Sequence, residues 1–294
     1  MDVHLVDGTY ELFRHYFALP SHVDGGGVEV GAVRGVIGSV LNLMEEGATH
    51  VAVATDHVVE SFRNELWDGY KSGEGIEPDL HGQFPLLEQA LEAMGVVVWP
   101  MVDLEADDGL ASGAHVAGRD DRVGQVIICT PDKDLAQCVS GRQVVQLDRR
   151  KRVVMDEAGV VEKFGVLPES IPDYLALVGD SADGFPGLPG WGAKSAAAVL
   201  GRYRHLEQIP AHVDAWDVTV RGATKLAASL AEGRDAAELF RNLATLRIDA
   251  DVGRVDDWRW DGATPAFAAW TDRLGAPRLV ARTDTLARTR EDTT

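Results

Sequence analysis

The sequence predicts an α/β protein with a mostly parallel, twisted sheet flanked by helices, followed by a helical lobe. Five short apolar runs alternate with helical patterns in roughly the first 150 residues, and nearly all-apolar strands are typical of parallel sheets covered on both faces. After about residue 165 the strand pattern fades, and short helical stretches split by Gly and Pro replace it. The 294 residues, 45% of them hydrophobic, suffice for one large or two small domains with a real core.

The elements follow in order along the chain. The predicted strands are VHLV before Asp7, HVAVAT before Asp56, GVVVWP at 95–100, QVIICT before Asp132 and QVVQLD at 143–148. Helical patterns include FPLLEQALEAM, LEADDGLASGAHVAG, PESIPDYLALVGD, AKSAAAVLGRYRHLEQI, GATKLAASLAEG and DAAELFRNLATLRI. An amphipathic stretch lies near 265–278, and the polar end, TDTLARTREDTT, is expected to fray. We therefore expect an α/β core over 1–164, a helical lobe over 165–260, and a C-terminal helix with a frayed tail over 261–294.

Composition bounds the class of protein. No run of 18 apolar residues occurs, and MDVHLVDG lacks a signal-peptide pattern, so no membrane association is expected. The two cysteines favour buried thiols in a reducing cytoplasm. The net charge of −19 alone argues against nucleic acid. However, residues 1–140 carry 24 acids and 7 bases, whereas residues 141–294 carry 23 and 21. Either the first half has an acidic surface, or some of its acids converge on a cation.

Three acids lie just beyond predicted strand ends, where open α/β sheets bind their ligands. The full set of candidate acids is Asp7, Asp56, Glu105, Asp107, Asp108, Asp132, Asp134, Asp180 and Asp183. Each alone is also consistent with a helix dipole, an N-cap or a turn. Gathered together, they would repel strongly unless cations neutralised them. Hard oxygen ligands predict Mg²⁺ or Mn²⁺, and two such ions about 4 Å apart suit in-line attack on a phosphodiester. The nine histidines show no comparable spacing, which makes zinc unlikely.

A glycine-rich turn, GLPGWGAK, precedes an alanine-rich helix. Glycine lets the backbone approach a ligand, and the N–H groups of a helix N-terminus bind phosphate. The turn therefore predicts a contact to a nucleic-acid backbone that does not read bases. A Pro/Gly loop joining two helices is the equally open alternative. The residues concerned are Gly187, Gly190, Gly192 and Lys194.

At this point five ordered motifs resemble the 5′ nucleases, which include flap endonucleases and the 5′–3′ exonuclease domain of bacterial DNA polymerase I. The similarity covers roughly residues 1–255 and is carried by LVDGTYELFRHYFALP, ATDHVVESFRNELWDGYKSG, LEADDGLASGA, TPDKDLAQCV and DYLALVGDSADGFPGLPGWGAKSAAAVL. The resemblance implies a PIN-like core, a helical arch near 63–95 and a helix–hairpin–helix near 175–200 that holds duplex DNA.

The resemblance also implies residue roles. All nine acids match metal positions: a first-metal group of Asp7, Asp56, Glu105, Asp107 and Asp108, and a second-metal group of Asp132, Asp134, Asp180 and Asp183. Of these, Asp7 and Asp132 are expected to be catalytic, together with Arg14 and Lys71, which match bases at the scissile phosphate. Arg63 resembles an arginine at the arch base and is expected to contact DNA. The hairpin carbonyls of relatives also bind a monovalent cation such as K⁺.

The sequence departs from the family pattern in two places. Glu74 stands where relatives carry arginine, and residues 57–100 hold eight acids against two bases. Gly184 replaces a common asparagine after the last motif aspartate. The chain also ends before a polymerase domain could fit, so we expect a stand-alone nuclease.

The sequence as a whole predicts a metal-dependent 5′–3′ exonuclease and 5′-flap endonuclease acting at single-strand/duplex junctions in replication or repair. Expected partners are 5′-flap, nicked or gapped DNA and RNA primer–DNA hybrids, bound by a monomeric, cytoplasmic, nucleoid-associated protein. A PIN-type ribonuclease is one alternative, although single-stranded RNA needs no duplex clamp. A DNA-structure-binding protein with weak catalysis is another, which the acidic arch favours and the complete acid set disfavours.

Overall fold

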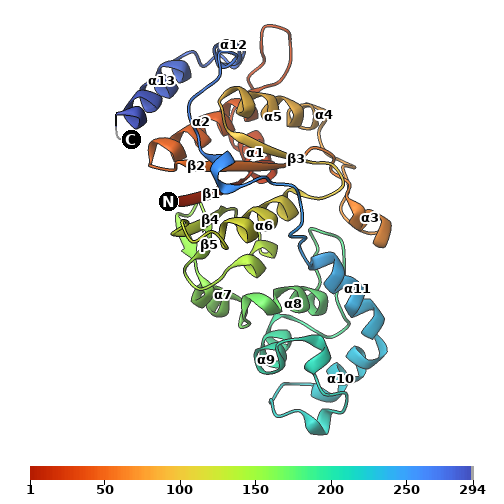
Figure 1. Cartoon of the computed structure of the whole chain (residues 1–294). Helices are drawn as coiled ribbons and strands as arrows, with labels where there is room; N and C mark the ends of the chain where they lie inside the picture. Colours follow the sequence, from red (N-terminus) through yellow and green to blue (C-terminus); the bar gives the residue numbers. More distant parts are fainter. Residues whose placement is uncertain (293–294) are drawn as a thin grey trace. The chain divides into compact units, whose positions relative to one another are not determined.

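The computed structural model describes residues 1–292 of the chain, which forms two compact units (Figure 1). Unit 1 contains Met1–Val59, Gly73–Thr130 and the chain from Ile248 onward. Unit 2 contains Glu60–Ser72 and Pro131–Arg247. Each unit is therefore assembled from segments that are distant in sequence.

Unit 1 contains four parallel strands in the order β3-β2-β1-β4. Their bounds are Asp2–Asp7 (β1), His50–Asp56 (β2), Val97–Met101 (β3) and Gln125–Cys129 (β4). In register, Leu5 of β1 lies between Ala52 of β2 and Ile128 of β4. Because the strands are parallel, their carboxyl ends meet at one edge of the sheet. The predicted fold class is confirmed, and each strand coincides with a predicted apolar run.

Helices cover both faces of these strands. The helix α6 packs on the face of β2 that presents Ala54, whereas α1 begins against Val53 and Thr55 on the other face. Successive residues of a strand point to opposite faces, so β2 is buried on both sides, as its apolar sequence predicts. The helices of unit 1 are Gly8–Ala18 (α1), Gly31–Glu45 (α2), Pro78–His81 (α4), Phe84–Ala93 (α5), Ala106–Ala117 (α6), the 3₁₀ helix Val255–Trp258 (η5), Phe267–Arg273 (α12) and Arg278–Glu291 (α13).

Unit 2 is mostly helical. Its core lies around α8, α9 and α11, where the rings of Phe185 and Phe240 stack at 5.6 Å between centroids and Trp67 meets Phe240 edge-on. Its elements are Phe62–Leu66 (α3), Asp134–Cys138 (η1), Val144–Asp148 (β5), Val153–Met155 (β6), Glu157–Phe164 (α7), Pro168–Ser170 (η2), Ile171–Val178 (α8), Ala193–Tyr203 (α9), Leu206–Gln208 (η3), Val213–Ala215 (η4), Ala223–Glu232 (α10) and Arg234–Ala244 (α11). In the described part of the chain, no helix combines the length and the apolar character that crossing a bilayer requires.

The end of the chain differs from the expected frayed tail. Residues up to Glu291 form α13, which packs on α2. The Arg282 guanidinium pairs with Glu45 at 2.5 Å, and Arg290 Nη2 donates to the carbonyls of Met44 and Ala48. The polar side chains therefore anchor the helix instead of leaving it solvated. The last two residues of the predicted tail, 293–294, lie outside the described part of the chain.

Candidate metal centre

Two of the predicted acids end neighbouring strands of unit 1. Asp7 ends β1 and caps α1: its Oδ1 accepts from the Tyr10 amide at 2.8 Å, and its Oδ2 accepts from Thr130 Oγ1 at 2.8 Å. Asp56 ends β2, next to β1 in the sheet. Both carboxylates therefore lie at the carboxyl edge of the strands. Thr130, which follows β4 and helps to orient Asp7, was not identified from the sequence.

The acids of the LEADD motif stand at the N-terminus of α6. Asp56 Oδ1 accepts from the Ala106 amide at 2.7 Å, which ties the end of β2 to the start of this helix. Asp108 Oδ2 accepts from the Glu105 amide at 3.0 Å. Glu105 and Asp108 are 3% and 0% exposed, and Asp107 is half-buried. Unit 1 thus places Asp7 and Asp56 at the ends of β1 and β2, and the three LEADD acids at the positive end of a helix dipole.

A second acid group lies in unit 2. One carboxylate oxygen from each of Asp134, Asp180 and Asp183 lies within 4.8 Å of the others, and all three side chains are buried. Asp134 opens η1, while Asp180 and Asp183 belong to a tight loop closed by the amides of Asp180 and Phe185, which bond the opposite carbonyls. Two separate segments of the chain therefore present oxygen ligands to one point.

Asp134 is the most informative member of this group. Its Oδ1 is buried and has no hydrogen-bond partner. Burial raises the pKa of the Asp134 carboxyl well above its usual range, and the neighbouring Asp132, Asp183 and Asp180 raise it further. A buried acceptor of this kind costs free energy unless a ligand satisfies it. An all-oxygen donor set of this size fits a hard divalent ion such as Mg²⁺ or Mn²⁺.

Two lysines form ion pairs with the other two members of the group, Asp180 and Asp183. Lys133 Nζ lies 2.5 Å from Asp180 Oδ2, and Lys71 Nζ lies 3.1 Å from Asp183 Oδ1. Burial lowers the pKa of the Lys133 ammonium, but the hydrogen bond with Asp180 and the charge of Asp134 outweigh it and raise that pKa. Lys71 was predicted from the sequence. Lys133 was not predicted, although its position between two acids of the TPDKD motif could have identified it as their partner.

Lys133→Met should strengthen binding of a divalent ion, since the ammonium competes for Asp180. We expect Mn²⁺ affinity to rise roughly three- to tenfold. The metal-free protein should lose about 1–2 kcal/mol of unfolding free energy, a value reduced by the partial exposure of the lysine. Calorimetric Mn²⁺ titration and urea unfolding in EDTA measure both, with the exposed Lys194→Met as control. Weaker Mn²⁺ binding by Lys133→Met would contradict this role.

Asp132 neighbours the buried trio but is not one of its members. Its side chain is exposed, its Oδ1 accepts from the Asp134 amide at 3.0 Å, and its carbonyl accepts from the Gln146 side chain. The structure therefore brings together three of the four acids predicted for the second group. Asp132 positions the turn that leads into η1.

Arg14 is held by a residue that the sequence did not single out. Arg14 Nη2 lies 2.5 Å from Oε2 of Glu11, one turn earlier on α1, and Ser39 Oγ donates to the same oxygen. The Glu11 carboxylate is buried, whereas Arg14 is partly exposed. The buried acid thus fixes the direction of the guanidinium. The i,i+3 spacing of Glu11 and Arg14 is the signal that reveals this pair.

Arg63 is placed differently from the other predicted bases. It is 1% exposed, its Nε donates to the Leu243 carbonyl at 2.8 Å, and its Nη2 donates to the Thr245 carbonyl at 3.2 Å. Helix carbonyls near a C-terminus lack partners within their own helix, and a buried arginine satisfies them here. In this structure Arg63 ties α3 to the end of α11 and does not reach solvent.

The glycine hairpin joins α8 to α9 in unit 2. Gly190 has φ +83°, lies exposed, and has nothing within 4 Å of where a Cβ would stand. Gly192 caps α9, and Lys194 is exposed in its first turn. Gly187, in contrast, is buried, and its Cβ would lie 2.4 Å from the Gly179 amide. The hairpin therefore has a packed base at Gly187 and an open tip at Gly190.

Gly184 explains one departure from the family pattern. Its φ is +84°, and a Cβ there would lie 1.9 Å from the Gly69 carbonyl oxygen. The Trp67 indole also donates to the Gly184 carbonyl at 3.1 Å. The asparagine that the family resemblance leads us to expect here could not occupy this position without moving the segment around Gly69.

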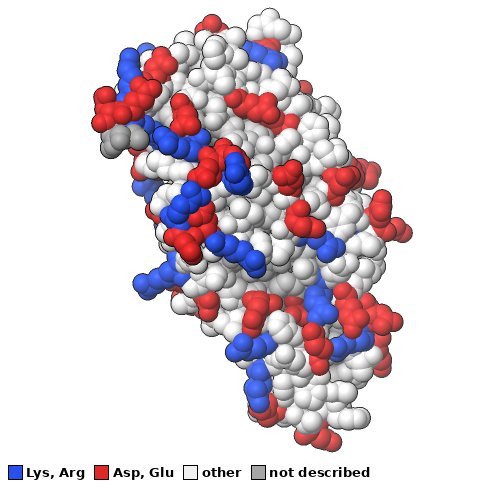
Figure 2. Space-filling view, viewed as in Figure 1, with Lys and Arg blue, Asp and Glu red and all other residues white. Residues whose placement is uncertain are grey.

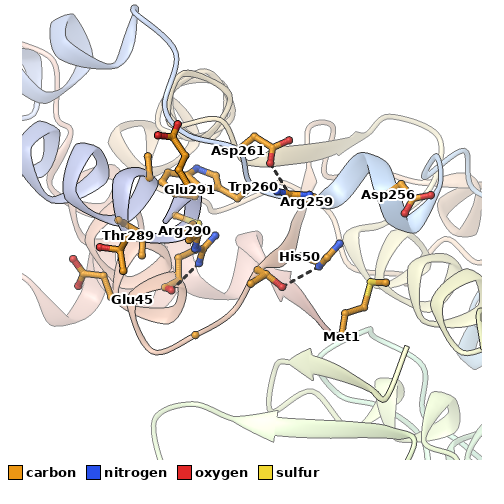
Figure 3. Close-up of a pocket in the computed structure, with 15 residues that line it drawn as sticks. Met1, Glu45, His50, Asp256, Arg259, Trp260, Asp261, Thr289, Arg290 and Glu291 are labelled. Atoms are coloured by element: carbon orange, nitrogen blue, oxygen red, sulfur yellow. Dashed lines mark hydrogen bonds and ion pairs between the residues drawn. The ribbon is translucent and has the colours of Figure 1, made fainter. Parts of the chain in front are cut away.

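A cavity of about 1070 Å³ lies elsewhere in unit 1 (Figure 3). It is lined by Met1, His50, Arg259, Trp260 and residues of α13. Met1 and His50 lie at the starts of β1 and β2, so the cavity is at the opposite sheet edge from Asp7 and Asp56. Figure 3 shows the Arg259 side chain directed toward Asp261, and Arg259 Nε lies 2.9 Å from Asp261 Oδ1. None of the nine predicted acids lines this cavity, which is therefore distinct from the acid sites.

Comparison with solved structures supports the fold. The flap endonuclease of bacteriophage T5, in a pseudo-enzyme-product complex with DNA and metal ions, matches 98% of this chain and all of its own, with a TM-score of 0.65 and 19% identity. The catalytic core of Rad2 in complex with DNA substrate matches 96% of this chain and 90% of its own, with a TM-score of 0.63 and 16% identity.

Sequence relatives are closer. The chain is 38% identical over 258 residues to DNA polymerase I of Pseudomonas aeruginosa, and 35% identical over 268 residues to that of Bacillus caldotenax. These matches cover 84% and 88% of this chain but only 27% and 29% of the polymerases. Two family models also match: the N-terminal resolvase-like domain of 5′–3′ exonucleases over residues 2–165, and their C-terminal SAM fold over residues 166–266. The chain therefore belongs to the 5′–3′ exonuclease family.

Proposed function

We propose that this chain is a metal-dependent 5′–3′ exonuclease and 5′-flap endonuclease that hydrolyses DNA at single-strand/duplex junctions in replication or repair. The observation that carries the proposal is the buried group of Asp134, Asp180 and Asp183, with an acceptor oxygen on Asp134 that has no hydrogen-bond partner. Family membership indicates the class of reaction, and the buried group of three aspartates indicates that the reaction uses a metal ion.

The acids divide into two ligand groups. In unit 2, Asp134, Asp180 and Asp183 would hold one Mg²⁺ or Mn²⁺, with Asp132 beside them. In unit 1, a second ion would bind among Asp7, Asp56, Glu105, Asp107 and Asp108. When bound, such ions supply an activated water and neutralise charge on the leaving oxygen. The proposal rests on the oxygen-only donors and on the placement of these acids at strand and helix ends.

Two bases would act on the reacting phosphate. Lys71 lies at the buried acid group through its contact with Asp183, and a lysine there can stabilise the charge that develops on a non-bridging oxygen. Arg14 is aimed by Glu11 and has a partly exposed guanidinium, which suits a phosphate contact. We assign Arg63 to the stability of unit 2, because its donors already bond backbone carbonyls.

The open tip of the glycine hairpin would hold the duplex backbone, with K⁺ bound by its carbonyls. The double variant Gly190→Asp/Lys194→Glu should therefore weaken duplex binding about tenfold, equally for unrelated sequences. Both sites are exposed, and Asp tolerates positive φ better than most residues, so the fold should persist. Fluorescence anisotropy with two unrelated duplexes measures the effect, and Arg278→Glu is the control. Loss confined to one sequence would instead indicate base readout.

We further propose that RNA primers paired to DNA are substrates, and that the protein acts as a monomer in the cytoplasm, at the nucleoid. The first point is motivated by recognition of phosphates without base contacts, because RNA and DNA strands carry the same phosphates.

A labelled 5′-flap duplex incubated with Mg²⁺, Mn²⁺ or EDTA tests the function. We expect short 5′ products with either ion and none in EDTA. Single-stranded RNA and single-stranded DNA of the same sequence serve as comparison substrates. Preferred cutting of single-stranded RNA would support a PIN-type ribonuclease instead, and tight flap binding without products would support a structure-binding protein.

A further inference from the structure

Four consecutive cations, Arg149–Arg152, stand out in a chain whose net charge is −19. They form the turn between β5 and β6, and we call this turn the basic hairpin. None of the predicted nucleic-acid contacts lies in it. The strands pair antiparallel, with Asp148 opposite Val153, so the turn is closed by a defined register.

The basic hairpin is ordered and open to solvent. The Lys151 amide donates to Asp148 Oδ1 at 2.9 Å, and Lys151 Nζ lies 3.4 Å from the same carboxylate. Arg150, Lys151 and Arg152 are exposed. Arg152 has φ 56°, a left-handed conformation that glycine or asparagine adopts more readily and that commonly marks a functional position. The turn therefore exposes long cationic side chains at positions where its backbone conformation does not require them.

The surrounding charge favours a polyanionic ligand. The arch region, 57–100, has eight acids against two bases, so it cannot supply the attraction that a phosphate backbone needs. The face drawn in Figure 2 intermingles acids and bases and shows no broad basic surface. A compact basic turn is therefore a distinct source of backbone affinity. The exposed apolar side chains beside it, Val153 and Val154, are too few to form an apolar interface.

The hairpin is also connected to the acid group of unit 2. The Gln146 side chain of β5 donates to the Asp132 carbonyl. Arg150 lies four residues beyond Gln146, and four residues span at most about 14 Å of chain. That length corresponds to roughly four base pairs along a duplex axis.

We propose that the basic hairpin is a backbone-binding site for duplex nucleic acid, contacting phosphates a few base pairs from the cleavage position. This inference rests on the proposed function and adds a contact to it. Binding through Arg150 and Arg152 would be independent of sequence, because a turn of this kind offers charge without an element shaped for a groove.

The test is the salt dependence of binding by Arg150→Gln/Arg152→Asn, in which Asn suits the left-handed backbone at position 152. Association constants are measured for a 5′-flap duplex of two unrelated sequences between low and moderate salt. If both contacts are phosphates, the slope of log K against log [salt] should flatten by about two, and affinity at moderate salt should fall about tenfold. The control Arg254→Gln/Arg288→Gln removes two exposed cations from unit 1 and should leave the slope unchanged.

Unchanged slope and affinity in the hairpin variant would overturn the inference, as would a loss seen with one sequence alone. A variant that binds DNA like the wild type but no longer binds vesicles of anionic lipid would assign the hairpin to membranes instead. Urea unfolding confirms that the variant is folded. Because binding is measured in Ca²⁺ or EDTA, the result does not depend on cleavage, so failure of the nuclease proposal is detected separately in the flap assay.

Discussion

Asp134→Asn is expected to abolish cleavage and, at the same time, to stabilise the metal-free protein. The carboxylate is buried, lies close to two others, and has an oxygen with no hydrogen-bond partner. An amide of the same shape removes the buried charge and one metal ligand together. Cleavage should fall about 10³-fold or more through loss of charge stabilisation. The unfolding free energy in EDTA should rise by about 1–3 kcal/mol.

Single-turnover cleavage of a 5′-flap substrate and urea unfolding in EDTA measure the two effects. Asp132→Asn is the matched control, because its carboxylate is exposed: it should change the unfolding free energy much less than Asp134→Asn does, whatever it does to cleavage. An ordinary structural aspartate would give the opposite pattern for Asp134, namely lower stability with metal binding retained. Mn²⁺ titration of the variant distinguishes these cases.

The pH dependence of stability follows from the same residue. Burial raises the pKa of Asp134 in the folded protein, so above about pH 4 the folded protein keeps a proton that the unfolded chain loses. The unfolding free energy of the metal-free protein should therefore fall as pH rises from about 4 toward the raised pKa. Asp134→Asn should remove this contribution. Urea unfolding in EDTA at several pH values, wild type against variant, measures the difference.

Lys71→Met is expected to slow cleavage by about 10²–10³-fold while changing DNA affinity only slightly. Its Nζ lies 3.1 Å from Asp183, at the acid group, and its backbone amide donates to the Asp183 carbonyl at 3.1 Å. The main-chain bond survives substitution, so the loop should keep its place. A charge needed at the transition state affects the rate, whereas one that binds the ground state affects affinity.

Single-turnover rates at saturating enzyme, together with dissociation constants in Ca²⁺, separate these effects. Lys71→Arg retains the charge and should recover part of the rate. Equal losses in rate and affinity would instead make Lys71 a DNA-binding residue.

The sequence predicts strands better than it predicts the partners of side chains. Asp7 and Asp56 follow from apolar runs that end at them, because parallel strands share a carboxyl edge. The strand β6 was missed, since Val153 and Val154 are exposed and the run is short. The tail was expected to fray because its residues are polar, but anchoring by Arg282 and Arg290 depends on α2, far away in sequence.

For the site residues, too, the sequence predicts identities better than it predicts side-chain partners. Arg63 has the residue type and position of a DNA contact, and only the tertiary structure reveals that backbone carbonyls occupy its donors. Lys133 and Glu11 are partners of predicted residues, and a pattern that identifies ligands does not identify what orients them.

Gly69 and Gly184 have a consequence for how this protein can exchange parts with its relatives. They come from the two separate segments of unit 2, and the backbone of one occupies the space that a side chain on the other would need. A chimera joined near residue 165 would take the first segment and the start of the second from one parent, and the rest of the second segment, including Gly184, from the other. If the second parent carries asparagine at position 184, the chain would still join correctly at the junction. The asparagine side chain, however, would collide with the loops around Gly69 and Lys71. Compatible recombinants must therefore inherit residues 60–72 and the last aspartate loop as one block.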